Sequence, residues 1–200
     1  MSTRTGDRTW SLTLVRAIPA AVVALLITFL ADHSAILGFF ALGGFALATG
    51  IVVLIAALRG AYPTRPFAIH GGLLIAGGAL ALTLNQAGLP VLLFLTSALF
   101  GATGIVELVT GLRARGVLPA ARDWIFVGAL SAVLAIAVLL IPADFREVFP
   151  IPGTTVPPLT ASVILVGLIG AYAAVVAVYL VIAGLSLKWA QHPSAIATEA

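Results

Sequence analysis

The chain alternates long apolar segments with short polar ones. Six segments of about 18 to 29 residues contain almost only Ala, Leu, Val, Ile, Gly and Phe, and they occupy residues 12–31, 35–58, 67–84, 89–112, 124–141 and 159–187. A helix that crosses the bilayer core needs about 20 consecutive apolar residues. The segments lack the strict two-residue alternation of membrane β-barrels. The pattern therefore predicts an all-α, polytopic membrane protein with six transmembrane helices, in which residues 1–200 form a single membrane domain.

A short internal repeat organises these helices. Residues 48–52 recur letter for letter at 102–106, and eight of the twelve positions in 48–59 match those 54 positions later, including the last arginine of each segment. The same offset aligns the first helix with the third. We therefore expect three like-oriented helical hairpins, with repeat units at 10–60, 66–116 and 122–189, related by an axis along the membrane normal rather than inverted.

The connections between the predicted helices are unequal. The turns at 31–34 and 85–88 are short, whereas the segment 142–158 is long and contains five prolines. This Pro-rich outer loop is either an insertion tolerated at the surface or a cap that contacts a partner. The polar ends at 1–9 and 191–200 are predicted to be flexible tails.

Charge predicts how the helices are oriented. The chain is 62% hydrophobic and 8% charged, with a net charge of +3. If six helices alternate in direction, nine of the ten basic residues fall at one end and only Arg146 at the other. Basic loops stay in the cytoplasm, so both termini are predicted to be cytoplasmic. The basic balance thus reflects topology, and no nucleic-acid partner is expected.

Small residues spaced four apart predict close helix contacts. Such pairs occur at 46/50, 72/76, 77/81 and 98/102. In the repeated segment Thr49 and Gly50 correspond to Thr103 and Gly104, and we interpret these four residues as a helix-packing surface. Their alternative role is in a ligand site. Three tryptophans near helix ends, Trp10, Trp124 and Trp189, are interpreted as anchors at the membrane interface.

Glu107 is the most unusual residue within the apolar segments. It stands where the preceding repeat unit has Val53. A carboxylate at this depth is costly, so it usually faces the bundle interior and has a partner. Arg16 and His70 align with each other in the repeat and lie at a similar depth. We therefore predict an intramembrane polar cluster of Arg16, His70 and Glu107, with a bidentate arginine–carboxylate pair and a histidine able to respond to pH.

A purely structural interpretation of these three residues competes with that prediction. Arg16 and His70 could extend to the cytoplasmic interface, and Glu107 could be protonated or paired with Arg113. These alternatives stay open on the sequence alone.

Motifs for catalysis are absent from the sequence. There is no phosphate loop, no His-Glu-x-x-His and no nucleophile elbow. The chain has no cysteine, and its three histidines are scattered over a turn, a helix and the tail. We therefore expect no catalytic residues, no metal site and no cofactor, and we predict that the protein is not an enzyme.

Three short motifs stand at corresponding places in the predicted hairpins. They are Trp10 and Trp124 ahead of first helices, the Ile-Pro end of the fifth helix at 141–142, and second helices that read Ala-Thr-Gly-Ile at 48–51 and 102–105. In these features the chain resembles the HdeD family of bacterial acid-resistance membrane proteins. The first and third helices lack the terminal proline of the family. The resemblance implies a multi-pass protein of the bacterial plasma (inner) membrane with a role in acid or stress tolerance.

Two classes of function follow. One is a non-catalytic stress protein of the membrane, whose partners are the lipid bilayer and either further copies of itself or another membrane protein. The other is a small proton, ion or solute channel or transporter that uses the Glu107 region. No small-molecule ligand is identified by the sequence.

Overall fold

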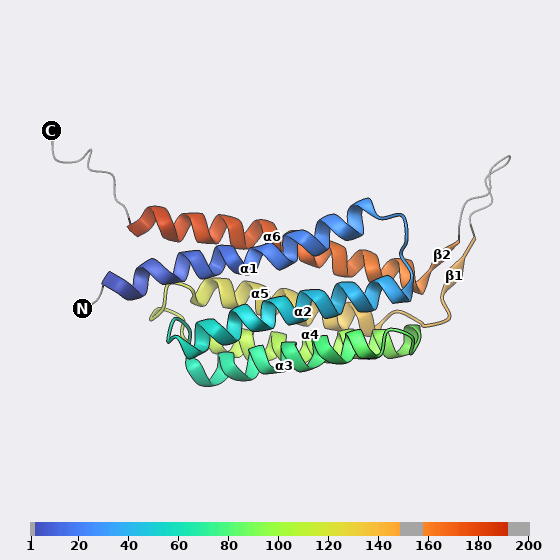
Figure 1. Ribbon diagram of the computed structural model, residues 1–200, viewed down its shortest axis with the longest axis horizontal. Coiled ribbons are helices and arrows are strands. Elements are labelled where there is room, and N and C mark those ends of the chain that lie inside the picture. The colour runs from blue at the N-terminus through green and yellow to red at the C-terminus, as the bar shows by residue number, and fades with distance from the viewer. Residues whose placement is uncertain (1–2, 149–157, 192–200) are drawn as a thin grey trace.

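The computed structural model is a bundle of six helices (Figure 1) and describes residues 3–148 and 158–191, with side chains from residue 10 to residue 190. The helices are α1 (Thr3–Phe29), α2 (Ala35–Leu58), α3 (Thr64–Thr83), α4 (Leu89–Arg113), α5 (Ala121–Leu139) and α6 (Ala161–Gln191). All six are long enough and apolar enough to cross a membrane. The structure thus confirms the six predicted helices, and their bounds differ from the predicted ones by a few residues.

The ends of the predicted segments differ from the structure mainly at the termini. Helix α1 begins at Thr3, so it extends across most of the segment 1–9 that was predicted to be a tail. Helix α6 ends at Gln191. The predicted tail at 192–200 lies outside the described residues.

The predicted Pro-rich outer loop contains a short β-ladder at its base. Strands β1 (Arg146–Glu147) and β2 (Leu159–Thr160) pair in antiparallel register, with Arg146 opposite Thr160. The Ala161 amide donates to the Phe145 carbonyl over 3.0 Å, which joins the ladder to the start of α6. The middle of the loop, residues 149–157, lies outside the described residues.

The six helices alternate in direction. Helix α1 begins and α6 ends at the same end of the bundle, and the β-ladder projects from the opposite end (Figure 1). The end with the helix termini also carries the α2–α3 and α4–α5 connections, where Arg59, Arg65, Arg113, Arg115 and Arg122 are exposed. Arg146 lies at the other end, in β1.

The closest helix contacts are α2 with α3, α4 with α5, and α1 with α6. Consecutive helices joined by the short turns at 31–34 and 85–88, such as α1 and α2, make less extensive contact. Glycines explain why α2 packs more closely on α3, and α4 on α5. A Cβ atom added to Gly71 would lie 2.9 Å from the Gly50 carbonyl oxygen, and one added to Gly128 would lie 2.8 Å from the Gly104 carbonyl oxygen. Backbones this close require glycine on both helices.

Two of the predicted small-residue pairs do not pack inside the chain. Gly72 and Ala76 are exposed on α3, and so are Ala98 and Ala102 on α4. No atom of a neighbouring element lies within 4 Å of a Cβ added to Gly72. For these pairs the prediction of close contact within the bundle is wrong, because the pattern gives the spacing on a helix but not the face that meets a neighbour.

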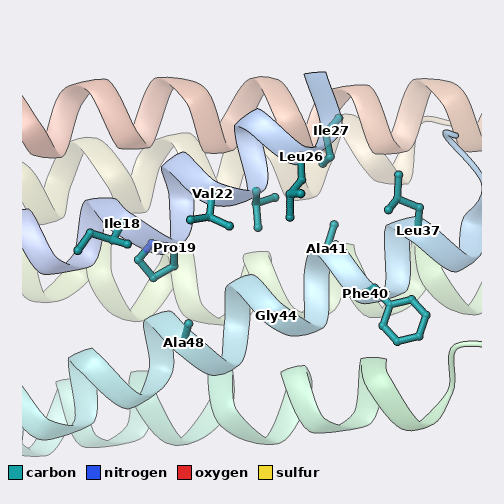
Figure 2. Close-up of a pocket in the computed structure, with 11 residues that line it drawn as sticks. Ile18, Pro19, Val22, Leu26, Ile27, Leu37, Phe40, Ala41, Gly44 and Ala48 are labelled. Atoms are coloured by element: carbon teal, nitrogen blue, oxygen red, sulfur yellow. The ribbon is translucent and has the colours of Figure 1, made fainter. Parts of the chain in front are cut away.

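Helices α1 and α2 leave a groove between them. It has a volume of about 370 Å³ and is lined only by apolar residues and Pro19 from these two helices (Figure 2). Ala48 and Gly44 of α2 have little or no side chain to fill it. We expect lipid chains to cover this groove in a bilayer, since apolar surface at membrane depth meets hydrocarbon.

The core has an aromatic cluster at its centre and another near one end. At the centre, the Phe100 ring lies 4.8 Å from the Tyr172 ring and 6.0 Å from the Phe45 ring. Near the end, the Phe67 ring lies 4.7 Å from Trp124 and 4.9 Å from Tyr62. Trp124 is only 2% exposed, so the prediction that it anchors the membrane interface is wrong; it packs in this second cluster instead.

Candidate functional site

Helix α4 positions Glu107 at the centre of the bundle. The buried positions of α4 recur at helical spacing through Phe100, Thr103, Glu107 and Thr110, so the glutamate shares its face with core residues. Its side chain is 1% exposed. A charge so far from solvent requires a close partner of opposite sign.

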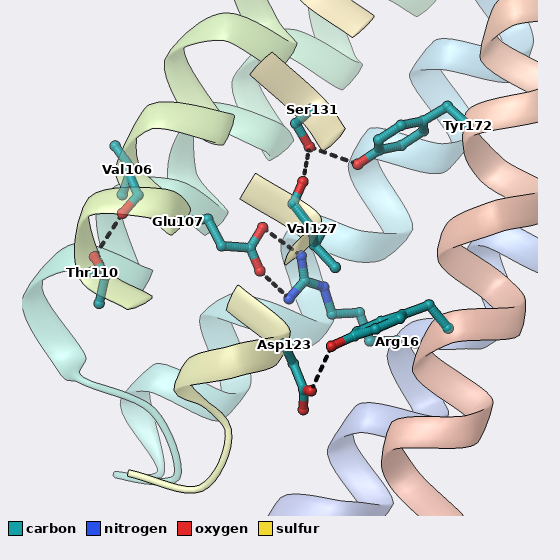
Figure 3. A network of polar contacts seen from close by, with 9 residues as sticks. Arg16, Val106, Glu107, Thr110, Asp123, Val127, Ser131 and Tyr172 are labelled. Atoms are coloured by element: carbon teal, nitrogen blue, oxygen red, sulfur yellow. Dashed lines mark hydrogen bonds and ion pairs between the residues drawn. The ribbon is translucent and has the colours of Figure 1, made fainter. Parts of the chain in front are cut away.

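Arg16 of α1 is that partner. Its Nη1 lies 2.5 Å from Glu107 Oε1, and its Nη2 lies 2.8 Å from Oε2 (Figure 3). The two parallel bonds form the bidentate pair that a planar guanidinium and a carboxylate favour. Arg16 is 5% exposed, so it does not extend to the interface, and Arg113 is exposed at the end of α4. The structure thus pairs Glu107 with Arg16 rather than with Arg113.

His70 of α3 lines the same cavity and is 2% exposed. Its Nδ1 has no hydrogen-bond partner within the described part of the chain. The structure therefore brings the three residues of the predicted cluster around one cavity, with Arg16 and Glu107 in direct contact.

All six helices contribute to this central cavity, which has a volume of about 10 Å³. Its polar lining consists of one or two residues from each helix: Arg16, Thr49, His70, Thr103, Glu107, Ser131 and Tyr172. The aromatic rings of Phe45 and Phe100 close it on the apolar side. The site thus combines an ion pair with hydroxyl and imidazole groups inside an otherwise apolar core.

Ser131 and Tyr172 belong to this site although the sequence analysis did not include them. The Ser131 hydroxyl lies 2.8 Å from the Tyr172 hydroxyl and 2.8 Å from the Val127 carbonyl oxygen (Figure 3). Both residues interrupt long apolar segments, and that interruption was the available signal. A second polar contact that the sequence analysis missed joins Tyr179 of α6 to Asp123 of α5, at 3.1 Å.

The four residues predicted as a packing surface divide into two roles. Gly50 and Gly104 lie at the close α2–α3 and α4–α5 contacts. Thr49 and Thr103 line the central cavity instead. Thr103 donates its hydroxyl hydrogen to the Leu99 carbonyl of its own helix over 2.6 Å, whereas the Thr49 hydroxyl has no partner among the described residues.

Tyr62 connects the central site to the connection between α2 and α3. It is 5% exposed, and burial raises the pKa of its phenol above the ordinary 10.0, while the nearby Arg16 guanidinium opposes that rise. The charge of Arg16 at the bundle centre therefore acts on the pKa of a group outside the membrane-spanning segments.

The chemistry available at the site is hydrogen bonding around a buried ion pair. Within the described ranges, no three His, Asp or Glu side chains are grouped so that they could hold a metal ion. The carboxylate of Glu107 is occupied on both oxygens by Arg16. Removal of that carboxylate would leave a guanidinium uncompensated in the core.

Comparison of the chain with protein-family models, curated proteins and solved structures finds no match.

Proposed function

We propose that this chain is a non-catalytic, multi-pass protein of the bacterial plasma membrane, of the HdeD type, that contributes to tolerance of acid. The observation that carries the proposal is the buried Arg16–Glu107 pair beside His70. Ionisable groups inside a membrane protein are costly and mark functional positions by default. A carboxylate and an imidazole are also the side chains whose charge changes between neutral and acidic pH.

The surroundings of Glu107 support a response to acid rather than catalysis. The groups that face the central cavity are Arg16 on α1, Thr49 on α2, His70 on α3, Thr103 on α4, Ser131 on α5 and Tyr172 on α6. Because Arg16 is the partner that compensates the Glu107 charge, loss of either side chain would leave the other charge without compensation in the core.

The same cavity gives less support to the alternative of a solute channel. Its volume of about 10 Å³ is close to the minimum for a single water molecule. A hydrated ion or a metabolite needs far more space. We therefore place the non-catalytic function first.

The experiment is an acid-survival assay in cells that lack the chain and carry variants of it. The informative variant is Arg16→Met together with Glu107→Leu, because apolar residues of similar volume can replace a buried ion pair without loss of folding. We expect this double variant to accumulate in the membrane like the wild type and to fail to restore survival. Arg113→Gln, at an exposed position, is the matched control and should restore it. Full survival with the double variant would overturn the proposal.

We also propose that both termini are cytoplasmic and that the bundle consists of three like-oriented hairpins. The collection of basic residues at the end with the helix termini supports the orientation. Equivalent contacts support the repeat: Gly50 lies against Gly71 of the next unit, Gly104 lies against Gly128, and Gly184 of α6 lies against Leu14 of α1.

A further inference from the structure

Three buried polar atoms without partners surround the central cavity. They are Arg16 Nε, Thr49 Oγ1 and His70 Nδ1, and each belongs to a residue that lines the cavity. Leaving a buried polar group without a hydrogen-bond partner destabilises the fold. Three such atoms from three different helices around one space therefore indicate a common partner.

The hydroxyl of Thr49 lacks the bond that the other small hydroxyl residues of the cavity make to their own helices. Its counterpart in the next repeat unit, Thr103, bonds the carbonyl four residues earlier in its helix, which is the usual way for a helical threonine to satisfy its hydroxyl. Ser131 does the same with Val127. The Thr49 hydroxyl makes no such bond within the described structure, so it is available to a group in the cavity.

The size of the cavity sets what can bind. Its volume of about 10 Å³ matches the lower limit for one water molecule, which also needs two to four polar partners. Three partners are present. We infer that the central cavity binds a single water molecule that hydrogen-bonds Arg16, Thr49 and His70.

The chemistry of the three atoms fits one water molecule. Arg16 Nε carries a hydrogen and can only donate, so the water oxygen accepts from it. The Nδ1 atom of a neutral imidazole donates or accepts according to the tautomer, so in either form it can bond the water. The Thr49 hydroxyl completes the set as either donor or acceptor.

Charge balance favours water over an ion. Arg16 and Glu107 neutralise each other, so an ion in the cavity would bring an uncompensated charge into the core. A neutral ligand with both donor and acceptor capacity avoids that cost. The bound water joins His70 to the ion pair through Arg16, which makes the three polar residues one hydrogen-bonded unit. This inference stands on geometry and does not depend on the role in acid tolerance.

The test is water-edited solid-state NMR of the full chain in lipid bilayers, with 15N-labelled histidine. The chain has three histidines, and His70→Gln assigns the His70 ring signals by their loss. We expect polarisation to pass from water protons to His70 Nδ1 in the wild type. Thr49→Val keeps the shape of the side chain but removes the hydroxyl, and should weaken this transfer.

Thr110→Val is the matched control, because the Thr110 hydroxyl bonds the Val106 carbonyl of its own helix and Thr110 lies outside the cavity lining; it should leave the transfer unchanged. A wild-type protein with the Arg16–Glu107 contact intact and no transfer from water to the His70 ring would overturn the inference. Equal transfer in Thr49→Val and wild type would remove Thr49 from the site and overturn the three-partner arrangement.

Discussion

At the scale of single residues, the difference between Val53 and Glu107 gives the site its character. Val53 is buried on α2, as Glu107 is on α4, so the two positions, which align in the sequence, are both in the interior but differ in chemistry. The glutamate could be predicted to need a partner because an isolated charge is so costly in the core. The pairing with Arg16 was predicted, but pairing with Arg113 stayed open, because the choice between them depends on how α1 and α4 are placed in the bundle.

Removing one member of the ion pair should be far more harmful than removing both. Glu107→Gln leaves the Arg16 guanidinium buried without its counter-charge, and we expect it to lower the free energy of unfolding by about 3–5 kcal/mol. The double variant with Arg16→Met and Glu107→Leu should recover most of that loss. Denaturant unfolding in detergent micelles measures both. A single variant as stable as the wild type would contradict the buried pairing.

Tyr62 predicts a loss of stability at alkaline pH. Burial raises the pKa of its phenol above 10.0 in the folded protein. Below that value the phenol is protonated in both states and its contribution is fully present; as pH rises further, the unfolded chain ionises first, so the free energy of unfolding falls. Between pH 8 and 11 the free energy of unfolding should fall more steeply with pH for the wild type than for Tyr62→Phe. Identical pH profiles for the two proteins would exclude this contribution.

At the scale of helices, hydropathy predicts where the elements lie but not how they pair. Each of the six spans could be located from composition and length, since both are local properties. The close pairing of α2 with α3 and of α4 with α5 could not, because small residues occur on more than one face of α3 and α4. Gly71 and Gly72 are neighbours in the sequence, yet only Gly71 meets another backbone.

Alanine substitutions at these two glycines should separate packing from helix propensity. A Cβ at Gly71 would lie 2.9 Å from the Gly50 carbonyl oxygen and 2.9 Å from the Leu54 amide nitrogen, and neither backbone atom can move alone. We expect Gly71→Ala to cost about 1–3 kcal/mol through overpacking. Gly72→Ala meets open space and should be neutral or slightly stabilising. Thermal unfolding of both variants measures the difference, and equal effects would refute the close α2–α3 contact.

At the scale of the whole molecule, the distribution of charge follows from local sequence, whereas the central cavity depends on how the six helices pack. Five arginines gather at one end of the bundle because they lie in or beside the α2–α3 and α4–α5 connections, and the sequence states these positions directly. The central cavity exists only because all six helices converge on it. Ser131 and Tyr172 interrupt apolar segments, but no local pattern shows that their hydroxyl groups meet at this cavity. That both termini lie at the same end of the bundle follows from an even number of spans.

The orientation of the molecule can be tested with two matched cysteine variants, because the chain has no cysteine of its own. Val117 lies in the α4–α5 connection and is 78% exposed, and Val148 follows β1 at the opposite end and is 60% exposed. Replacing either valine by cysteine changes no charge, so the basic asymmetry that sets the topology is preserved. In right-side-out spheroplasts a membrane-impermeant maleimide should label Val148→Cys at once and Val117→Cys only after the membrane is opened. Immediate labelling of Val117→Cys with protection of Val148→Cys would place the termini outside the cell, and the positive end of the bundle would then face away from the cytoplasm.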